Sequence, residues 1–404
     1  MIKAQVLRTP FFLKPFQWLA LSLIVFFASC SKKDDTVDPV DDPSVLVSST
    51  QLATLTKAEL TAEAVKISPL LAAYVKNGVI VYKLTYQTKN TDGQTITATG
   101  AVIVPDTNEE VPLLSVQHGT IESDASAPSN FQPDSEAATF GALFGAQGYI
   151  ISYPDYIGYG ASKDFQHPYE HRASLASASL DMLRAVKEFI AKENTTKWNN
   201  KLFLAGYSEG GYATMSLQKK IEEEASSEFN LVASSCGAGA YDKTAFMKYI
   251  VNAPTHGIAS YNKLYLWVLL TYDRVYGLNR PASYYFKEPY ASGIQSSGLD
   301  YPIDVSFNSI LTDSFRKAVA DGTDTALAEA IADNDVYNWK PTTPTRLYHG
   351  TDDQLVFFFN SQNAYDAMTK LGAPDLQLIP VSKGTHSTSI DDFLLGTLLF
   401  FTGK

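Results

Sequence analysis

The chain of 404 residues is 45% hydrophobic and 19% charged, which is an ordinary composition for a soluble globular protein. Its length permits one large domain with an insertion or two separate domains. The formal net charge of −11 disfavours nucleic acids and other polyanions as partners. The sequence contains no repeat with a period of about 20 to 50 residues, so a solenoid is not expected.

The N-terminus has the layout of a bacterial export signal. Basic residues precede an apolar run over residues 16–28, which is shorter than the roughly twenty residues needed to span a bilayer. Small residues then lead into Cys30, in a stretch that resembles the lipobox of bacterial lipoproteins, although Phe27 stands where leucine is more usual. We therefore expect residues 1–29 to be a lipoprotein signal peptide and Cys30 to carry a lipid that anchors the protein to the membrane.

The segment that follows is predicted to be a flexible tether. Residues 30–48 are acidic and contain proline, so they cannot bury apolar surface. The Lys-Asp-Asp run at residues 33–35 resembles the export signal of surface-displayed lipoproteins in some Gram-negative lineages. The resemblance implies the outer membrane as the location, with display at the cell surface as an alternative. Once Cys30 is lipidated, Cys236 is the one remaining cysteine, so no intramolecular disulfide is expected.

The next part of the chain predicts a helix, a hairpin and then an alternation of strands and helices. Residues 50–76 favour a helix, and residues 79–88 and 94–104 favour two strands joined by a turn at residues 91–93. Short apolar runs follow at residues 113–116, 148–152, 201–205, 231–235 and 345–348. Because these runs are apolar on both faces, they are typical of parallel strands covered by helices.

Residues 241–343 interrupt this alternation. The region is rich in Phe, Tyr and Trp, and helices are predicted around Phe246 and at residues 264–276 and 315–331. We interpret it as a helical cap inserted into a core made of residues 49–240 and 344–404. Its aromatic side chains could line a pocket for an acyl chain or a phenolic ester, or they could form the small core of the cap itself.

After the cap, a helix at residues 360–371, a strand at 376–381 and a helix at 389–401 complete the pattern. The predicted fold class is therefore α/β, with an antiparallel opening hairpin, a mostly parallel sheet flanked by helices and an inserted helical cap. This is the layout of the α/β-hydrolase fold.

The most specific motif is a Gly-x-Ser-x-Gly pentapeptide centred on Ser208, between a predicted strand and a helical pattern. A serine on a sharp strand-to-helix turn is exposed as a nucleophile, and Gly206 and Gly210 permit the close backbone packing of such an elbow. The pentapeptide also occurs by chance in glycine-rich loops, but here a strand and a helix flank it. The backbone N–H of Glu209 is the expected first oxyanion donor, and its side chain is expected to be merely solvated.

The catalytic acid is expected downstream of Ser208, because hydrolases with such an elbow carry nucleophile, acid and histidine in that order. Residues 349–356 follow a predicted strand and resemble the His-Gly-x-x-Asp-x-x-Val pattern of α/β-hydrolases. Asp353 matches the catalytic acid of that pattern, and Asp352 is the alternative. Phe357 replaces the proline that usually follows the valine, which blurs the register slightly.

His386 is the predicted base, because it lies in the loop between the last strand and the last helix. In this role it takes the proton of Ser208 and returns it to the leaving alcohol, while the carboxylate holds the imidazole. His349 is expected to be structural, and His256 lies in the predicted cap.

The second oxyanion donor is expected in the loop after the third strand. Residues 117–120, Gln-His-Gly-Thr, stand in the position of the His-Gly motif of lipases and esterases. Either Thr120 or Gly119 would supply the backbone N–H. His118 is disfavoured as a catalytic base because it precedes the nucleophile.

Residues 167–171, His-Pro-Tyr-Glu-His, match the His-x-x-Glu-His pattern of inverted zinc proteases. A zinc site needs a further acidic ligand, and no persuasive one is identifiable in the sequence. We therefore predict no metal and interpret these residues as a loop that leads into a helix at residues 173–191.

The chain from about residue 79 to its C-terminus thus resembles the α/β-hydrolase superfamily. Residues 99–105, 117–120 and 153–160 look like the secretory lipase family and its bacterial relatives. The resemblance implies hydrolysis of a small-molecule or lipid ester, a helical cap over the site and no cofactor.

Two alternatives stay open. A serine peptidase of the aminopeptidase type would use the same fold and triad. A surface lipoprotein could instead capture ligands on a hydrolase scaffold without catalysis, although the complete set of triad residues disfavours this.

Overall fold

The computed structural model describes residues 44–67, 72–193 and 196–404, all within one unit that spans Pro43–Lys404. The predicted signal peptide, Cys30 and most of the predicted tether lie outside the described residues, so these assignments stay predictions. Within the described ranges, no helix is long and apolar enough to cross a membrane.

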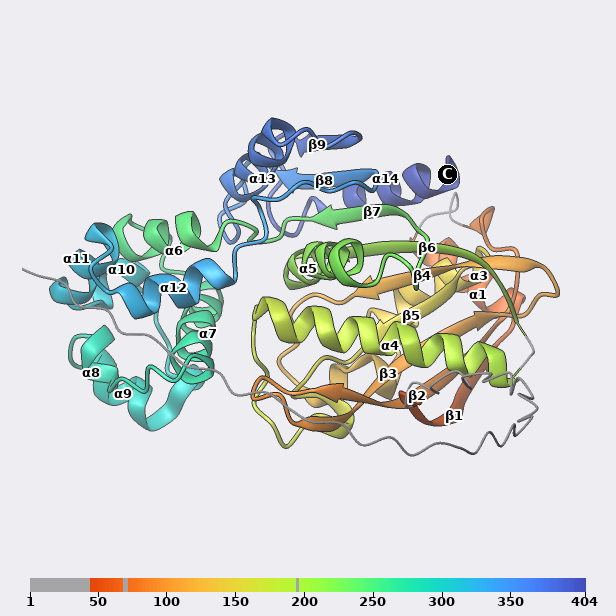
Figure 1. Cartoon of the computed structure of the whole chain (residues 1–404), viewed down its shortest axis with the longest axis horizontal. Helices are drawn as coiled ribbons and strands as arrows, with labels where there is room; N and C mark the ends of the chain where they lie inside the picture. Colours follow the sequence, from red (N-terminus) through yellow and green to blue (C-terminus); the bar gives the residue numbers. More distant parts are fainter. Residues whose placement is uncertain (1–43, 68–71, 194–195) are drawn as a thin grey trace, which may run out of the picture. The chain divides into compact units, whose positions relative to one another are not determined.

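The described residues form a sheet of nine strands in the order β1-β2-β3-β5-β4-β6-β7-β8-β9 (Figure 1). The strands are β1 (Leu46–Leu55), β2 (Val79–Lys89), β3 (Thr95–Pro105), β4 (Glu110–Gln117), β5 (Ile150–Pro154), β6 (Lys197–Tyr207), β7 (Leu231–Gly237), β8 (Thr345–Gly350) and β9 (Leu376–Val381). Strands β1, β2, β3 and β5 pair antiparallel in that order, and every pairing from β5 through β4 to β9 is parallel. The predicted hairpin, the buried runs and the mostly parallel sheet are confirmed.

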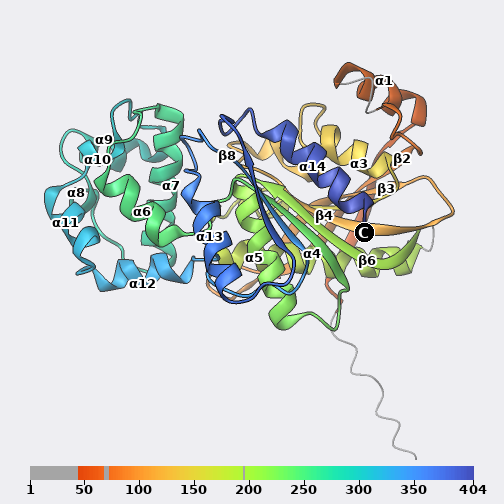
Figure 2. The same ribbon diagram turned by 90° about the horizontal axis from the view of Figure 1, so that it is seen from above.

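Helices cover both faces of the sheet, as Figures 1 and 2 show. One face carries α4 (Arg172–Glu193), α5 (Glu209–Glu224) and α13 (Phe359–Lys370), and the other carries α1 (Lys57–Ile67), α3 (Ala142–Ala146) and α14 (Ile390–Thr402). Successive strand residues point to opposite faces, so Leu113 of β4 belongs to the same hydrophobic cluster as Leu183 of α4, whereas Leu114 belongs to the cluster of Phe393 of α14. Because both faces are covered, the central parallel strands contain continuous buried runs, such as residues 202–205 of β6, as the sequence pattern indicates.

The predicted cap is a group of helices inserted between β7 and β8, next to the carboxyl ends of the parallel strands (Figure 1). Its helices are α6 (Lys243–Asn252), α7 (Ala259–Val275), α8 (Ala282–Tyr285), α9 (Tyr290–Ser297), α10 (Phe307–Ile310), α11 (Asp313–Asp321) and α12 (Thr325–Asp333). The region predicted to be helical at residues 315–331 is divided at Gly322, whose φ of 66° ends α11 in a left-handed cap.

Most cap aromatics form the core of the cap. Tyr272, Tyr285, Phe307 and Phe315 are each at most 1% exposed and belong to one hydrophobic cluster, which also receives Leu355 from the hydrolase core. Of the two interpretations of these aromatics, packing within the cap applies to more of the side chains than lining of a pocket.

The prediction of a helix over residues 50–76 is wrong in its first part, and it also extends too far, because residues 73–76 are turn and irregular structure. Leu46–Leu55 is strand β1, which pairs antiparallel with β2, and the helix begins only at Lys57. A partner edge from a distant segment supplies backbone hydrogen bonds that outweigh local helix propensity. The predicted tether also extends too far, because Ser48 already pairs with Thr85. One local signal does mark the true helix start: Thr56 and Glu59 form a capping box.

Candidate active site

Ser208 stands on a strained turn between β6 and α5. Its φ of 61° and ψ of −124° are rarely adopted by a residue with a side chain. Hydrogen bonds from Ser208 N to Gly237 O (2.9 Å) and from Tyr212 N to Ser208 O (3.1 Å) hold the turn. The serine therefore lies at the carboxyl end of the strand and at the N-terminus of the helix, as in a nucleophile elbow.

Gly206 and Gly210 allow the strand and the helix to approach each other at this turn. A Cβ on Gly206 would lie 2.3 Å from the carbonyl oxygen of Gly210, and a Cβ on Gly210 would lie 2.0 Å from that of Gln117. Both oxygens belong to the backbone and cannot move aside cheaply. These two contacts explain why the elbow carries glycine on both sides of the serine.

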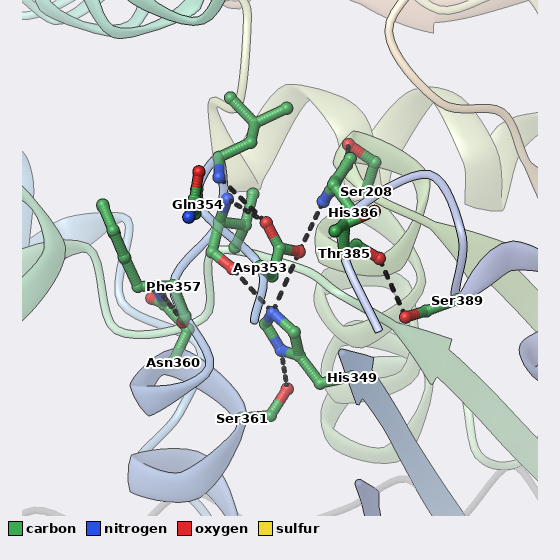
Figure 3. A network of polar contacts seen from close by, with 12 residues as sticks. Ser208, His349, Asp353, Gln354, Phe357, Asn360, Ser361, Thr385, His386 and Ser389 are labelled. Atoms are coloured by element: carbon green, nitrogen blue, oxygen red, sulfur yellow. Dashed lines mark hydrogen bonds and ion pairs between the residues drawn. The ribbon is translucent and has the colours of Figure 1, made fainter. Parts of the chain in front are cut away.

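Two loops bring His386 and Asp353 to Ser208 (Figure 3). The loop after β8 carries Asp353, and the loop between β9 and α14 carries His386. His386 Nδ1 lies 2.6 Å from Asp353 Oδ2, and its Nε2 lies 2.8 Å from Ser208 Oγ. A carboxylate accepts, so Nδ1 carries the hydrogen and Nε2 is free to accept the hydroxyl proton. Asp353 is 4% exposed, whereas the alternative acid, Asp352, is exposed to solvent.

The Asp353 carboxylate is held in its ionised form. Burial raises its pKa, but hydrogen bonds and charge interactions with His349 and His386 outweigh this and lower the pKa to about 2. The backbone N–H groups of Leu355 and Val356 also donate to its Oδ1, at 2.9 and 3.0 Å. Asp353 is thus an anion held in a fixed position beside Nδ1 of His386.

His349 is a buried neighbour of Asp353. It is fully buried, and its Nε2 lies 2.7 Å from the carbonyl oxygen of Val356 and 3.3 Å from Asp353 Oδ2. Its Nδ1 contacts Ser361 Oγ at 2.7 Å (Figure 3). The expectation that His349 is structural agrees with these contacts, which hold the loop that carries Asp353.

The loop after β4 distinguishes between the two candidates for the second oxyanion donor. The N–H of Gly119 already donates to Glu136 Oε1 at 3.2 Å. Among the described residues, the N–H of Thr120 forms no hydrogen bond, while its hydroxyl contacts Tyr169 OH at 2.8 Å. The N–H of Glu209 is at the start of α5, where no helical partner exists. Of the two candidates on this loop, Thr120 is therefore the one whose N–H has no partner among the described residues, and the Glu209 N–H has none within α5.

The sequence model of the secretory lipase family matches residues 123–391, which is more than half of the chain. The chain belongs to the secretory lipase family. It is accordingly a carboxylic ester hydrolase of the lipase and esterase type, with the α/β-hydrolase fold. Among curated proteins, none matches the sequence of this chain.

Solved structures from bacteria and a yeast share the fold of this family member. A hydrolase of Legionella pneumophila is 24% identical with a TM-score of 0.78, and the match covers 89% of this chain and 98% of that one. The rice cell wall degrading esterase LipA from Xanthomonas oryzae is 25% identical with a TM-score of 0.71, covering 88% and 95%. Candida antarctica lipase A in its closed state is 14% identical with a TM-score of 0.62, covering 89% and 81%.

The structure contradicts the prediction that the Glu209 side chain is solvated. The residue is 2% exposed, and its Oε1 lies 2.8 Å from His167 Nε2. The other ring nitrogen of His167 donates to the carbonyl oxygen of Ile157 at 2.7 Å. Glu209 is therefore part of a buried pair in this family member, because the loop after β5 folds over the start of α5. A local sequence pattern does not contain that contact.

The His-x-x-Glu-His stretch at residues 167–171 is a loop whose side chains have separate partners. His167 pairs with Glu209, Glu170 forms an ion pair with Lys243, and His171 contacts Ser174 Oγ at 2.9 Å. Over the described ranges, no group of three or more His, Cys, Asp or Glu residues could hold a metal ion.

The pair of Glu170 and Lys243 links the core to the cap helix α6, and sequence patterns did not identify it. Both side chains are buried; burial raises the pKa of Glu170 and lowers that of Lys243, while each partner opposes the shift of the other. The Lys243 ammonium also lies 4.2 Å from the centre of the Tyr212 ring.

A cavity of about 370 Å³ opens beside Ser208 and His386. Its walls come from the sheet, from α3 and α14 and from the cap helix α7. A volume of this size is within the range of small-molecule sites.

Proposed function

We propose that the chain hydrolyses carboxylic esters through an acyl-enzyme intermediate on Ser208. The observation that carries this proposal is the continuous hydrogen-bonded series from Ser208 Oγ through His386 to Asp353, with distances of 2.8 and 2.6 Å. His386 accepts the hydroxyl proton as Ser208 attacks the ester carbonyl carbon, and it then protonates the departing alkoxide. Water, deprotonated in the same way, attacks the acyl-enzyme and releases the acid.

The negative charge of the tetrahedral intermediate would be stabilised by the backbone N–H groups of Glu209 and Thr120. The first lies at the N-terminus of α5, where the helix dipole favours an anion. The second lies on the loop after β4, which lines the same cavity as Ser208. Both donors are backbone groups, so their positions depend on the packing of the two segments.

The test is hydrolysis of p-nitrophenyl acetate and butyrate by the purified chain, compared with Ser208→Ala. The matched control is Ser292→Ala, which removes an exposed serine of the cap. We expect Ser208→Ala to lose the activity and Ser292→Ala to keep it. A fluorophosphonate probe should label the wild-type chain and not Ser208→Ala by intact mass. Full activity of Ser208→Ala would reject the mechanism.

The peptidase and the non-catalytic alternatives are separated by the same preparation. Aminoacyl p-nitroanilides, tested in parallel, should be cleaved far more slowly than the esters. Cleavage of the anilides alone would assign a peptidase. A chain that neither reacts with the probe nor cleaves any ester would be a binding protein on a hydrolase scaffold.

We also propose that the protein is exported and lipid-anchored through Cys30, with the outer membrane as its location. The lipobox-like sequence before Cys30 and the acidic segment after it support this proposal. Labelling of cells with an alkyne fatty acid should mark the wild-type chain but not Cys30→Ala. Protease treatment of intact cells would distinguish display at the surface from the inner leaflet. Equal labelling of both chains would reject Cys30 as the lipid site.

A further inference from the structure

The cavity beside Ser208 continues along the face of the sheet that α3 and α14 cover. Strands β4 and β6 supply one wall through Leu114 and Ala205. The π-helical turn η3 (Ala137–Gly141) and α3 supply a second wall, which includes Phe144, and α14 supplies a third. Figure 2 shows α3 and α14 on the same face of the sheet, and residues of both belong to one hydrophobic cluster.

Two independent walls give the same length for this cavity. On β4 the lining extends from Gln117 back to Leu114, and the three steps along the strand between them span about 10 Å. On α14 the lining extends from Ile390 to Thr397, and the seven steps of helical rise between them also span about 10 Å. Carbon–carbon bonds of about 1.5 Å advance an extended chain by roughly 1.3 Å each, so about eight carbons fill this length.

The deep end of the cavity is apolar and shielded from solvent. Leu114 and Thr397 are each 1% exposed, and the Thr397 hydroxyl is already hydrogen-bonded to Ser235 Oγ at 2.6 Å. Among the described residues that line the cavity, no buried side-chain polar atom lacks a partner. A polar ligand would gain no hydrogen bond there, whereas an apolar chain would gain burial.

Charged side chains lie where the cavity adjoins a second hollow. A second hollow shares Glu122 with the cavity and is lined by Lys263 and Asp300. Lys263 Nζ lies 2.6 Å from Glu122 Oε2 and 3.9 Å from Asp300 Oδ1. The cavity thus combines an apolar recess with the exposed carboxylates of Glu122 and Glu136, which also line it.

We propose that the recess holds the acyl chain of the ester and gives the enzyme a preference for straight acyl chains of about eight carbons. This inference rests on the proposed function. The acyl group stays bonded to Ser208 through two steps, which suits a recess shielded at its deep end. The alcohol must leave before water attacks, so the proposal does not require the recess to enclose it.

The test uses two neighbouring leucines of α14. Leu394 lines the recess and is half-buried, whereas Leu395 does not line it and is 55% exposed. We expect the wild-type kcat/KM for p-nitrophenyl esters to be highest near octanoate. Leu394→Trp should lower the octanoate-to-acetate ratio of kcat/KM by at least about tenfold. Leu395→Trp, the matched control, should leave the ratio unchanged.

Phe144→Ala provides the opposite test, because it removes a wall residue and should move the optimum to longer chains. Ratios measured on one preparation do not depend on the fraction of folded protein. If the octanoate-to-acetate ratio of kcat/KM is unchanged in both Leu394→Trp and Phe144→Ala while Ser208-dependent hydrolysis is intact, the acyl recess is overturned. The proposed function would still stand.

Acetate esters of ethanol and octanol then test which part of the ester enters. A Leu394→Trp effect on the octyl-to-ethyl ratio, without one on the octanoate-to-acetate ratio, would assign the recess to the alcohol. Absence of hydrolysis for every ester would reject the proposed function together with this inference.

Discussion

Two buried pairs of histidine and carboxylate lie close to the elbow. His386 and Asp353 are 2.6 Å apart, and His167 and Glu209 are 2.8 Å apart. In both pairs the carboxylate side chain is at most 1% exposed. The two pairs are alike in that each joins a histidine to a carboxylate through one short contact.

They differ in the group that faces the second ring nitrogen. His386 Nε2 faces the Ser208 hydroxyl, which can give up a proton. His167 Nδ1 faces the carbonyl oxygen of Ile157, which can only accept. His167 therefore faces no group from which it could take a proton. A histidine beside a carboxylate is a base only when its second nitrogen meets a donor.

The largest expected effect is the loss of the His386 imidazole. His386→Ala should lower kcat/KM by a factor on the order of 10⁵, because the general base of the triad is removed. Ester hydrolysis measured beside His256→Ala, which changes an exposed cap histidine, provides the control. A loss of tenfold or less would place the base elsewhere.

The next effect distinguishes the two neighbouring aspartates. Asp353→Asn should lower kcat by about 10⁴-fold, since the amide no longer holds the imidazole in the tautomer that accepts from Ser208. Asp352→Asn should stay within about threefold of the wild-type kcat, because its side chain is in solvent. The opposite ranking of the two variants would exchange their assignments.

His167→Ala should affect stability more than chemistry. It leaves the Glu209 carboxylate buried without its partner, which should reduce the free energy of unfolding by about 3 to 5 kcal/mol. Urea unfolding followed by circular dichroism measures this, and kcat should fall by no more than about 100-fold. An activity loss equal to that of His386→Ala at unchanged stability would contradict the comparison.

The Asp353 carboxylate should make stability depend on pH. Its pKa is lowered from 3.8 to about 2 in the folded state, which corresponds to about 2 kcal/mol. Because the folded pKa is the lower one, this contribution is present above about pH 4 and is lost as the pH falls through about 2. The difference in unfolding free energy between wild type and Asp353→Asn should therefore narrow between pH 5 and pH 2. A constant difference would contradict the shift.

Glu209→Gln is expected to have the smallest effect. The glutamine amide can donate to Nε2 of a neutral His167, and the backbone N–H of the residue is retained. We expect kcat/KM within about fivefold of wild type, measured beside Glu209→Ala, which loses the contact. A fall as large as that of Asp353→Asn would show that the second carboxylate takes part in the chemistry.

Much of the fold follows from local patterns. Strands β4 to β8 are predicted from short apolar runs because strands of a parallel sheet are buried on both faces. The elbow is predicted because its glycines and serine are consecutive in the chain. Asp353 and His386 are predicted from separate motifs, and the structure brings both to Ser208. Their catalytic roles stay predictions until the variants are measured.

Other features depend on contacts between distant segments. Strand β1 forms because β2 offers an edge, and Glu209 is buried because the loop carrying His167 covers it. The N–H of Gly119 is engaged because Glu136 lies beside it, and this contact is the reason why Thr120 is the proposed oxyanion donor of the two. The acyl recess likewise requires walls from the sheet, α3 and α14 together.

The sequence alone therefore determined the order of strands β2 to β9 and the residues able to carry the chemistry, because periodicity and tight turns are properties of neighbouring residues. The tertiary structure decided which polar groups are buried, what faces each histidine nitrogen and where an acyl chain fits. Those properties arise when segments far apart in the chain exclude water from one another, and no local pattern contains that information.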